Sequence, residues 1–306
     1  MTLKRLETQR SQIFTMKGIT TLVYFDIEAT GLKSSGRPRI TEISCVAVNM
    51  DSILRLSLEI KKILKNPNLE GYAIELESLQ PRIVNKLTLC VYPMATIVPH
   101  VSDITGLDNY MLNGQSKFNK STGNLLNSFL SHLPSPVCLV AHNGDCYDFP
   151  LLKAEMEKVH TPMDPSILCV DSYSGIKNIY NKKVDLSQPY IRTNIKSIGS
   201  DVNASNINKK QSVEFIKNRT TYYQPCSGKL RSSKLMKISP LCHPSSFSLV
   251  NLHNHLLGFP PSKSHGAEAD CLTLLRTTAA LGQEWLDWVE ENCYLIEGCQ
   301  AMWHMA

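Results

Sequence analysis

The chain has 306 residues, of which 42% are hydrophobic and 19% are charged, a composition that predicts a globular protein with a full core. No apolar run approaches the roughly 20 residues of a membrane-spanning helix, and the N-terminus lacks the apolar stretch of a secretory signal, so we expect no membrane partner. The ten cysteines form no CxxC pair and several lie within apolar runs, which indicates a reducing compartment, either the cytoplasm or the nucleus.

Four segments in the first third of the chain have the pattern of β-strands. They cover residues 21–27, 40–48, 53–60 and, less distinctly, 85–91. The first three follow one another closely, so we expect them to form an antiparallel meander.

The rest of the chain alternates between helix and strand patterns before it becomes helical. The predicted elements are a helix at 124–133, a strand at 137–142, a helix at 147–158, a strand at 167–170, and helices at 247–257, 267–281 and 284–293. A meander followed by such an alternation predicts an α/β fold, with a mixed five-stranded sheet flanked by helices on both faces.

Positive charge is concentrated in one stretch of the chain. The formal net charge is +5, but residues 177–245 hold 13 Lys or Arg and only three acids. This stretch is also rich in Asn and Ser and has little hydrophobic periodicity, as is typical of flexible insertions. We therefore expect a disordered N-terminal extension at 1–19 and a single domain at 20–303, interrupted by a basic, flexible insertion at about 181–244. A mobile basic insertion would attract polyanions without base specificity.

Two acids end the first predicted strand. Side chains alternate faces along a strand, so Asp26 and Glu28 point the same way, roughly 6.5 Å apart. Two carboxylates this close have raised pKa values unless a cation neutralises them, and oxygen ligands favour Mg²⁺ or Mn²⁺. Taken alone, the pair is better explained as exposed carboxylates where a strand leaves the core.

A third acid follows the predicted strand at 137–142. In HNGDCYDFPLL the turn at Asn143 and Gly144 precedes a helix, which places Asp148 in the first helical turn at the end of a strand. The helix dipole favours an acid there in any case. On sequence alone, Asp145 competes with Asp148 for the same role.

A fourth acid and a histidine lie in SHGAEADCLTLL, at residues 264–275. Asp270 enters the predicted helix at 267–281, and His265 lies five residues before it, on the preceding loop. A histidine on a loop beside a metal-binding carboxylate can swing and accept a proton from water.

In combination, these motifs resemble the DEDDh exonucleases and, more closely, their TREX (three-prime repair exonuclease) branch. The order DxE, D and H-x4-D is that of the family, and the resemblance covers roughly residues 20–180 and 245–303. The segments that carry it are FDIEATGL, PRIVNKLTLCVYP, DITGL, CLVAHNGDCYDFPLL, CVDS and SHGAEADCLTLL. The resemblance implies an RNase H-like fold.

The resemblance also implies a mechanism. Asp26, Glu28, Asp148 and Asp270 would hold two Mg²⁺ ions, for which Mn²⁺ can substitute, and His265 would be the general base. The enzyme would be a metal-dependent 3′→5′ DNA exonuclease that releases nucleoside 5′-monophosphates by two-metal-ion hydrolysis. It would prefer single-stranded or frayed 3′ ends.

Six further positions match substrate-binding residues of the family. Leu32 and Ile104 correspond to residues that wedge against the terminal bases, a contact that tolerates any sequence. Ala29, through its backbone, and Tyr147 correspond to neighbours of the terminal nucleotide and scissile phosphate.

His142 and Lys177 correspond to positions that steady the single strand. Cys146 departs from the family pattern, because the related enzymes carry an arginine there, so one phosphate contact would be missing. The basic insertion is a second departure and could compensate electrostatically. The family also pairs as homodimers through an edge strand, and the meander here predicts the same.

Two other functions stay open. The first is a DEDDh-type exoribonuclease that recognises the sugar 2′-OH, although the segments at 81–93 and 138–152 favour DNA. The second is an inactive nucleic-acid-binding module, which the presence of all five catalytic positions argues against.

Overall fold

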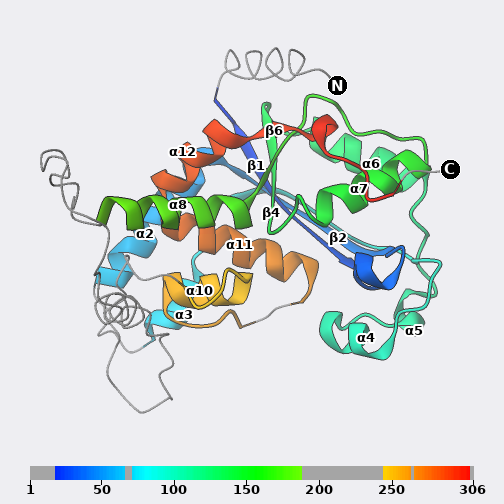
Figure 1. The fold of residues 1–306 in the computed structure, drawn as a ribbon, viewed down its shortest axis with the longest axis horizontal. Coiled ribbons are helices and arrows are strands. Elements are labelled where there is room, and N and C mark those ends of the chain that lie inside the picture. The colour runs from blue at the N-terminus through cyan, green and yellow to red at the C-terminus, as the bar shows by residue number, and fades with distance from the viewer. Residues whose placement is uncertain (1–17, 66–70, 188–243, 263–264, 304–306) are drawn as a thin grey trace, which may run out of the picture.

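The computed structural model describes residues 18–65, 71–187, 244–262 and 265–303 (Figure 1). The N-terminal extension and the basic insertion therefore lie mostly outside the described residues. Helix α8 (Ser172–Ser187) extends into the first seven residues of the segment assigned to the insertion.

A mixed six-stranded sheet forms the centre of the molecule. Its strands are β1 (Thr21–Ala29), β2 (Ile40–Asn49), β3 (Ile83–Cys90), β4 (Val137–Ala141), β5 (Leu168–Asp171) and β6 (Tyr294–Leu295). They lie in the order β3-β2-β1-β4-β5-β6. The pairs β1–β2, β2–β3 and β5–β6 are antiparallel, and the pairs β1–β4 and β4–β5 are parallel. A five-stranded sheet was predicted, whereas the described sheet has six strands; β6 is only two residues long and has no periodicity that a sequence could reveal.

The strand predicted at 53–60 is wrong. These residues lie within helix α2 (Met50–Lys65). Its buried face includes Ile53, Leu56 and Ile60, which follow helical spacing, whereas Leu58 is 54% exposed. The third strand of the meander is instead β3, which covers most of the segment predicted at 85–91.

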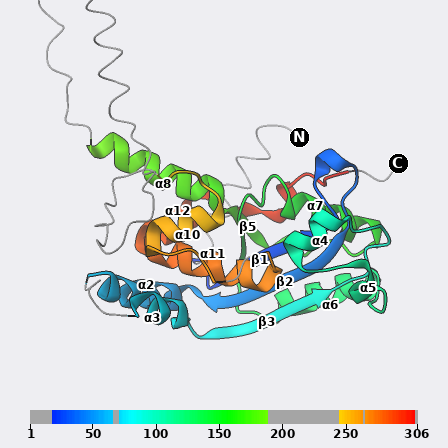
Figure 2. The ribbon, with the colours of Figure 1, turned by 90° about the horizontal axis from the view of Figure 1, so that it is seen from below.

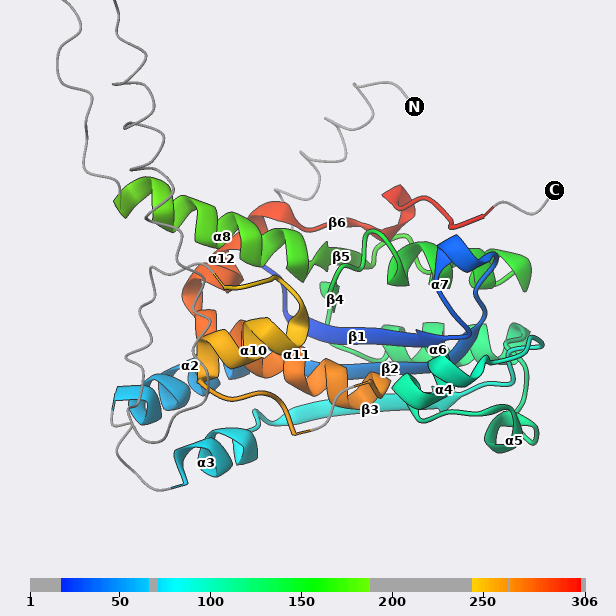
Figure 3. The same cartoon turned by 60° about the horizontal axis from the view of Figure 1, so that its bottom comes forward.

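Helices cover both faces of the sheet, as predicted (Figures 2 and 3). Along β1 the side chains alternate: Leu22 and Tyr24 belong to one apolar cluster, and Val23 and Phe25 belong to the other. The first cluster includes residues of α2, α8, α10 (Leu249–Leu257), α11 (Ala267–Leu281) and α12 (Gln283–Asn292). The second includes residues of α6 (Lys120–Ser131) and α7 (Asp148–Lys158).

Three short helices were not predicted. They are α3 (Tyr72–Ser78), α4 (Pro99–Thr105) and α5 (Asn109–Leu112). Around α4 and α5, the side chains of Ile97, Val101, Leu107 and Leu112 form a separate small core. No helix in the described part of the chain is long and apolar enough to span a bilayer.

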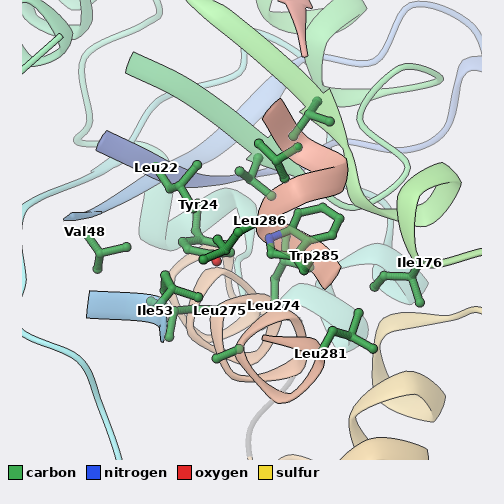
Figure 4. Close-up of a cluster of buried hydrophobic side chains, with 14 of the residues drawn as sticks. Leu22, Tyr24, Val48, Ile53, Ile176, Leu274, Leu275, Leu281, Trp285 and Leu286 are labelled. Carbon is green, nitrogen blue, oxygen red and sulfur yellow. The ribbon is translucent and has the colours of Figure 1, made fainter. Parts of the chain in front are cut away.

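A buried hydrogen bond sets the position of α11 on β1. The hydroxyl groups of Tyr24 and Thr278 lie 2.7 Å apart within the larger apolar cluster, where Tyr24 packs close to Leu286 and Trp285 (Figure 4). Both hydroxyl groups are inaccessible to water, so sliding α11 along the strand would break this bond and leave polar atoms unpaired.

Candidate active site

Strand β1 carries Asp26 and Glu28 on the face that packs against α11. They continue the series begun by Leu22 and Tyr24, but both are half-buried, since the apolar cluster ends beneath them. In the antiparallel register Asp26 lies opposite Ser44, and Glu28 lies opposite Glu42 of β2. The strand therefore leaves the core with its acids pointing toward the helical layer.

Asp270 reaches these acids from the first turn of α11. One carboxylate oxygen from each of Asp26, Glu28 and Asp270 lies within 4.8 Å of the other two. The three groups come from residues up to 244 positions apart in the sequence. Only oxygen atoms face one another here, the donor set that suits a hard divalent cation.

Asp148 approaches from the other helical layer. It is the first residue of α7, is 5% exposed, and its Oδ1 accepts a hydrogen bond of 3.1 Å from the backbone N–H of Ile27. Because Ile27 lies between Asp26 and Glu28, this bond holds the fourth carboxylate against the strand that carries the other two. Asp148 is not within the 4.8 Å group, but its charge adds to that of Asp26.

The turn before α7 requires glycine for its close approach. A Cβ on Gly144 would lie 2.6 Å from the Cβ of Ala141 and 2.8 Å from the ring of Phe149. Asp145, the alternative to Asp148, instead accepts a hydrogen bond from the Tyr294 hydroxyl on the surface. The structure thus brings Asp148, and not Asp145, to the acidic cluster.

Burial raises the pKa of all four acids, and repulsion between carboxylates adds to the effect on Asp26, Glu28 and Asp148. Burial, and then the charges of Asp148, Glu28 and Asp270, raise the pKa of Asp26 well above its ordinary value. Burial and the charges of Asp270 and Glu42 raise the pKa of Glu28 to about 7. Burial raises the pKa of Asp148 to about 7, and burial also raises the pKa of Asp270. A bound cation would remove this electrostatic cost, so the cluster fits a divalent metal.

His265 lies on the loop before α11, as predicted. Its backbone N–H donates to Asp270 Oδ2 over 3.1 Å, and its side chain is exposed. Its φ of 65° lies in the left-handed region, which few non-glycine residues adopt. The backbone hydrogen bond therefore holds this residue beside Asp270, with its side chain exposed to solvent.

The predicted base-contacting residues lie on two separate segments. Leu32 follows β1 and is 65% exposed, and Ile104 of α4 is 52% exposed. Ala29 is buried as the last residue of β1. The hydroxyl of Tyr147 donates to the carbonyl of Gly31, and this bond ties the start of α7 to the loop that carries Leu32.

His142 and Lys177 both lie against the ring of Tyr173, in the first turn of α8. Nδ1 of His142 lies 2.9 Å from the Ser172 hydroxyl, and Nε2 lies 2.9 Å from the carbonyl oxygen of Phe247. Burial lowers the pKa of His142 to about 4, so the ring is neutral, and Nε2 donates to the carbonyl. The Lys177 ammonium lies 5.8 Å from the centre of the Tyr173 ring. The contacts of both residues with DNA stay predictions, and His142 already uses both ring nitrogens within the protein.

Two acids that the sequence pattern did not identify as site residues support the site. Asp171, at the end of β5, accepts hydrogen bonds from the backbone N–H groups of Asn143 and Tyr173, over 2.8 and 2.9 Å, and so holds the turn that leads to Asp148. Glu42 accepts a hydrogen bond from the backbone N–H of Ala267. The motif CVDS contains Asp171 and could have identified it. Glu42 could not be found in this way, because its role depends on a contact between residues 225 positions apart.

The chain is similar in sequence to known exonucleases and in fold to a solved one. No model of a known protein family matches the chain. Human three-prime repair exonuclease 1 is 32% identical over 275 residues, which cover 89% of this chain and 67% of the human protein. Mouse three prime repair exonuclease 2 is 35% identical over 161 residues, or 52% of this chain and 62% of the mouse protein. A solved structure of exonuclease I is 11% identical, with a TM-score of 0.52 over 88% of this chain and 43% of that chain, and shares the RNase H-like fold.

Proposed function

The chain belongs to the three-prime repair exonuclease family and is a 3′→5′ exonuclease, and we propose that it degrades DNA from a free 3′ end to nucleoside 5′-monophosphates. The observation that carries this proposal is the meeting of Asp26, Glu28 and Asp270 within 4.8 Å, with Asp148 hydrogen-bonded to the strand between the first two. The four acids come from three distant parts of the chain. Because like charges repel, they do not stabilise one another, so bringing them together favours a bound cation.

These four carboxylates would hold a pair of Mg²⁺ ions, for which Mn²⁺ can substitute. When bound, the ions would lower the pKa of the attacking water and stabilise the leaving 3′ oxygen. His265 accepts the proton of that water, because its ring is exposed on a loop whose backbone is bonded to Asp270. Asp148 keeps its carboxylate directed at the site through the N–H of Ile27.

The substrate that suits the described surface is a single-stranded or frayed 3′ end. Exposed apolar side chains at Leu32 and Ile104 would stack against the terminal bases without regard to sequence. The backbone of Ala29 and the ring of Tyr147 would lie along the terminal nucleotide. His142 and Lys177 would steady the strand beyond it, with Lys177 supplying the positive charge.

The enzyme would act as one domain over residues 20–303, inside the cell. We also propose that it forms a homodimer through β3, which is an edge strand of the described sheet. Edge strands present unpaired backbone groups to a second copy. Light scattering coupled to gel filtration should give twice the mass of the chain, and a monomer at micromolar concentration would contradict this.

The activity is tested with single-stranded DNA and RNA of equal length, labelled at the 5′ end and incubated with Mg²⁺. The intact protein should shorten the DNA stepwise from its 3′ end, and Asp26→Ala should not. Asp145→Asn is the matched control, because Asp145 is a nearby acid outside the cluster, and it should cut like the intact protein. Faster degradation of RNA would identify an exoribonuclease, and binding without degradation would identify an inactive binding module.

A further inference from the structure

The N-terminus of α11 has no capping side chain of its own. The residue before the helix is Gly266, which offers no side-chain acceptor. The first backbone N–H groups of a helix have no hydrogen-bond partner within the helix. One of them belongs to Ala267, which is fully buried. An acceptor from elsewhere in the fold is therefore needed.

Glu42 of β2 supplies that acceptor. Its Oε2 accepts a hydrogen bond of 2.9 Å from the Ala267 N–H, and the Cys90 thiol lies 4.0 Å from its Oε1. Glu42 also lies opposite Glu28 in the β1–β2 register, on the same face. The negative charge of Glu42 would repel that of Glu28. We therefore attribute the role of Glu42 to its contact with α11, because the positive N-terminal end of a helix favours an anion.

A second contact holds the same turn of the helix but is more exposed. Glu268 accepts hydrogen bonds from Lys86 Nζ over 2.7 Å and from the Thr88 hydroxyl over 3.2 Å, both on β3. The side chains of Lys86 and Glu268 are 46% and 36% exposed. Water and salt weaken such a pair, so we expect the contact through Glu42 to hold the turn more strongly.

Asp270 lies three residues after Ala267, within the same turn of α11. The rest of the helix is held by other contacts, among them the hydrogen bond between Tyr24 and Thr278 and that from the Cys271 thiol to the carbonyl of Ser44, so the contact through Glu42 acts on the first turn. His265 is bonded to Asp270 through its backbone, so this loop moves with the turn.

We propose that Glu42 is a positioning residue, which docks the first turn of α11 on β2 and thereby sets where Asp270 meets Asp26 and Glu28. The proposal rests on the proposed function, because it assigns Glu42 a part in metal binding by that site. Since Leu32 and Ile104 lie on other segments, removal of the contact should weaken metal binding and catalysis and leave the binding of DNA unchanged.

Three variants of the full chain test this: Glu42→Ala, Glu42→Gln and Glu268→Gln. Glutamine keeps an oxygen that can accept from the Ala267 N–H, and the Glu268 variant alters the exposed contact in the same turn. Mn²⁺ affinity is measured by electron paramagnetic resonance without DNA, and kcat and KM are measured on single-stranded DNA over a range of Mg²⁺. Circular dichroism shows that each variant is folded.

Glu42→Ala should lose about 10- to 100-fold in Mn²⁺ affinity, as is typical for residues that support metal ligands, and kcat should fall with KM for DNA unchanged. Glu42→Gln should recover most of this loss, and Glu268→Gln should lose at most about fivefold. Wild-type Mn²⁺ affinity in Glu42→Ala would overturn the proposal. A loss in Glu42→Gln equal to that in Glu42→Ala would overturn it too, because the charge and not the acceptor would then matter. If the wild-type protein itself bound no Mn²⁺, the proposed function would fail.

Discussion

Asp148→Asn should stabilise the metal-free protein while it abolishes exonuclease activity. The amide oxygen of asparagine can still accept the hydrogen bond from Ile27, so the local geometry is retained. The change removes a negative charge that is 5% exposed and lies beside Asp26. The pKa of Asp148 rises from 3.8 to about 7, and about 3 pKa units correspond to an upper limit of about 4 kcal/mol. Because Asp26 shares this titration, we expect about 2 kcal/mol.

The sign of the effect depends on pH. The native carboxyl has a raised pKa, so between pH 4 and pH 7 the folded state binds more protons than the unfolded state, and stability falls as the pH rises. Above pH 7 the wild-type protein carries the full cost of the buried charge. Below the ordinary pKa both states are protonated, and the cost disappears. Asparagine should therefore stabilise strongly at pH 8 and only slightly at pH 4.5.

The assay is thermal unfolding in EDTA at pH 4.5 and pH 8. At pH 8 the melting temperature of Asp148→Asn should exceed that of the wild type by about 5 °C, given about 2–4 °C per kcal/mol. Added Mn²⁺ should raise the melting temperature of the wild type more than that of the variant. A variant less stable than the wild type at pH 8 in EDTA, or equally stabilised at both pH values, would refute the electrostatic argument.

Two further predictions concern the loop that carries Leu32. The side chain of Glu155 is completely buried and forms an ion pair with Arg39 Nε over 2.9 Å. Arg39→Met removes this ion pair, so the free energy of unfolding measured in urea should fall by about 3–5 kcal/mol. The double variant Arg39→Met, Glu155→Leu should recover most of this stability. If the single and double variants lost equal stability, the unpaired buried charge would not be the cause. Tyr147→Phe removes the hydrogen bond to Gly31, which should cost about 1 kcal/mol and raise KM for single-stranded DNA, because the loop loses its tie to α7. Steady-state kinetics with an unaltered KM would argue against that link.

The sequence predicted the parts of the site that depend on local pattern. Alternation along β1 placed Asp26 and Glu28 on one face, and the loop before α11 placed His265 beside Asp270, because both arrangements follow from the geometry of one element. The same reasoning misassigned residues 53–60, since their apolar residues alternate like a strand while Ile53, Leu56 and Ile60 also follow helical spacing.

The remaining parts depend on contacts between distant segments. Asp145 and Asp148 could not be separated from the sequence, because the choice follows from how tightly the turn at Gly144 packs against β4. The role of Glu42 depends on the register of β1 with β2 and on Ala267, far along the chain. Neither contact leaves a periodic trace in the sequence.

The separation of Asp26 from Asp270 by 244 residues has a consequence for biosynthesis. At roughly 5–20 residues per second, a ribosome needs on the order of 10–50 s to pass from one codon to the other. Throughout that interval the nascent polypeptide holds only part of the carboxylate set, and it lacks His265 until the last few residues. The acidic cluster therefore cannot assemble, and the chain cannot act as a nuclease, until most of it has been translated.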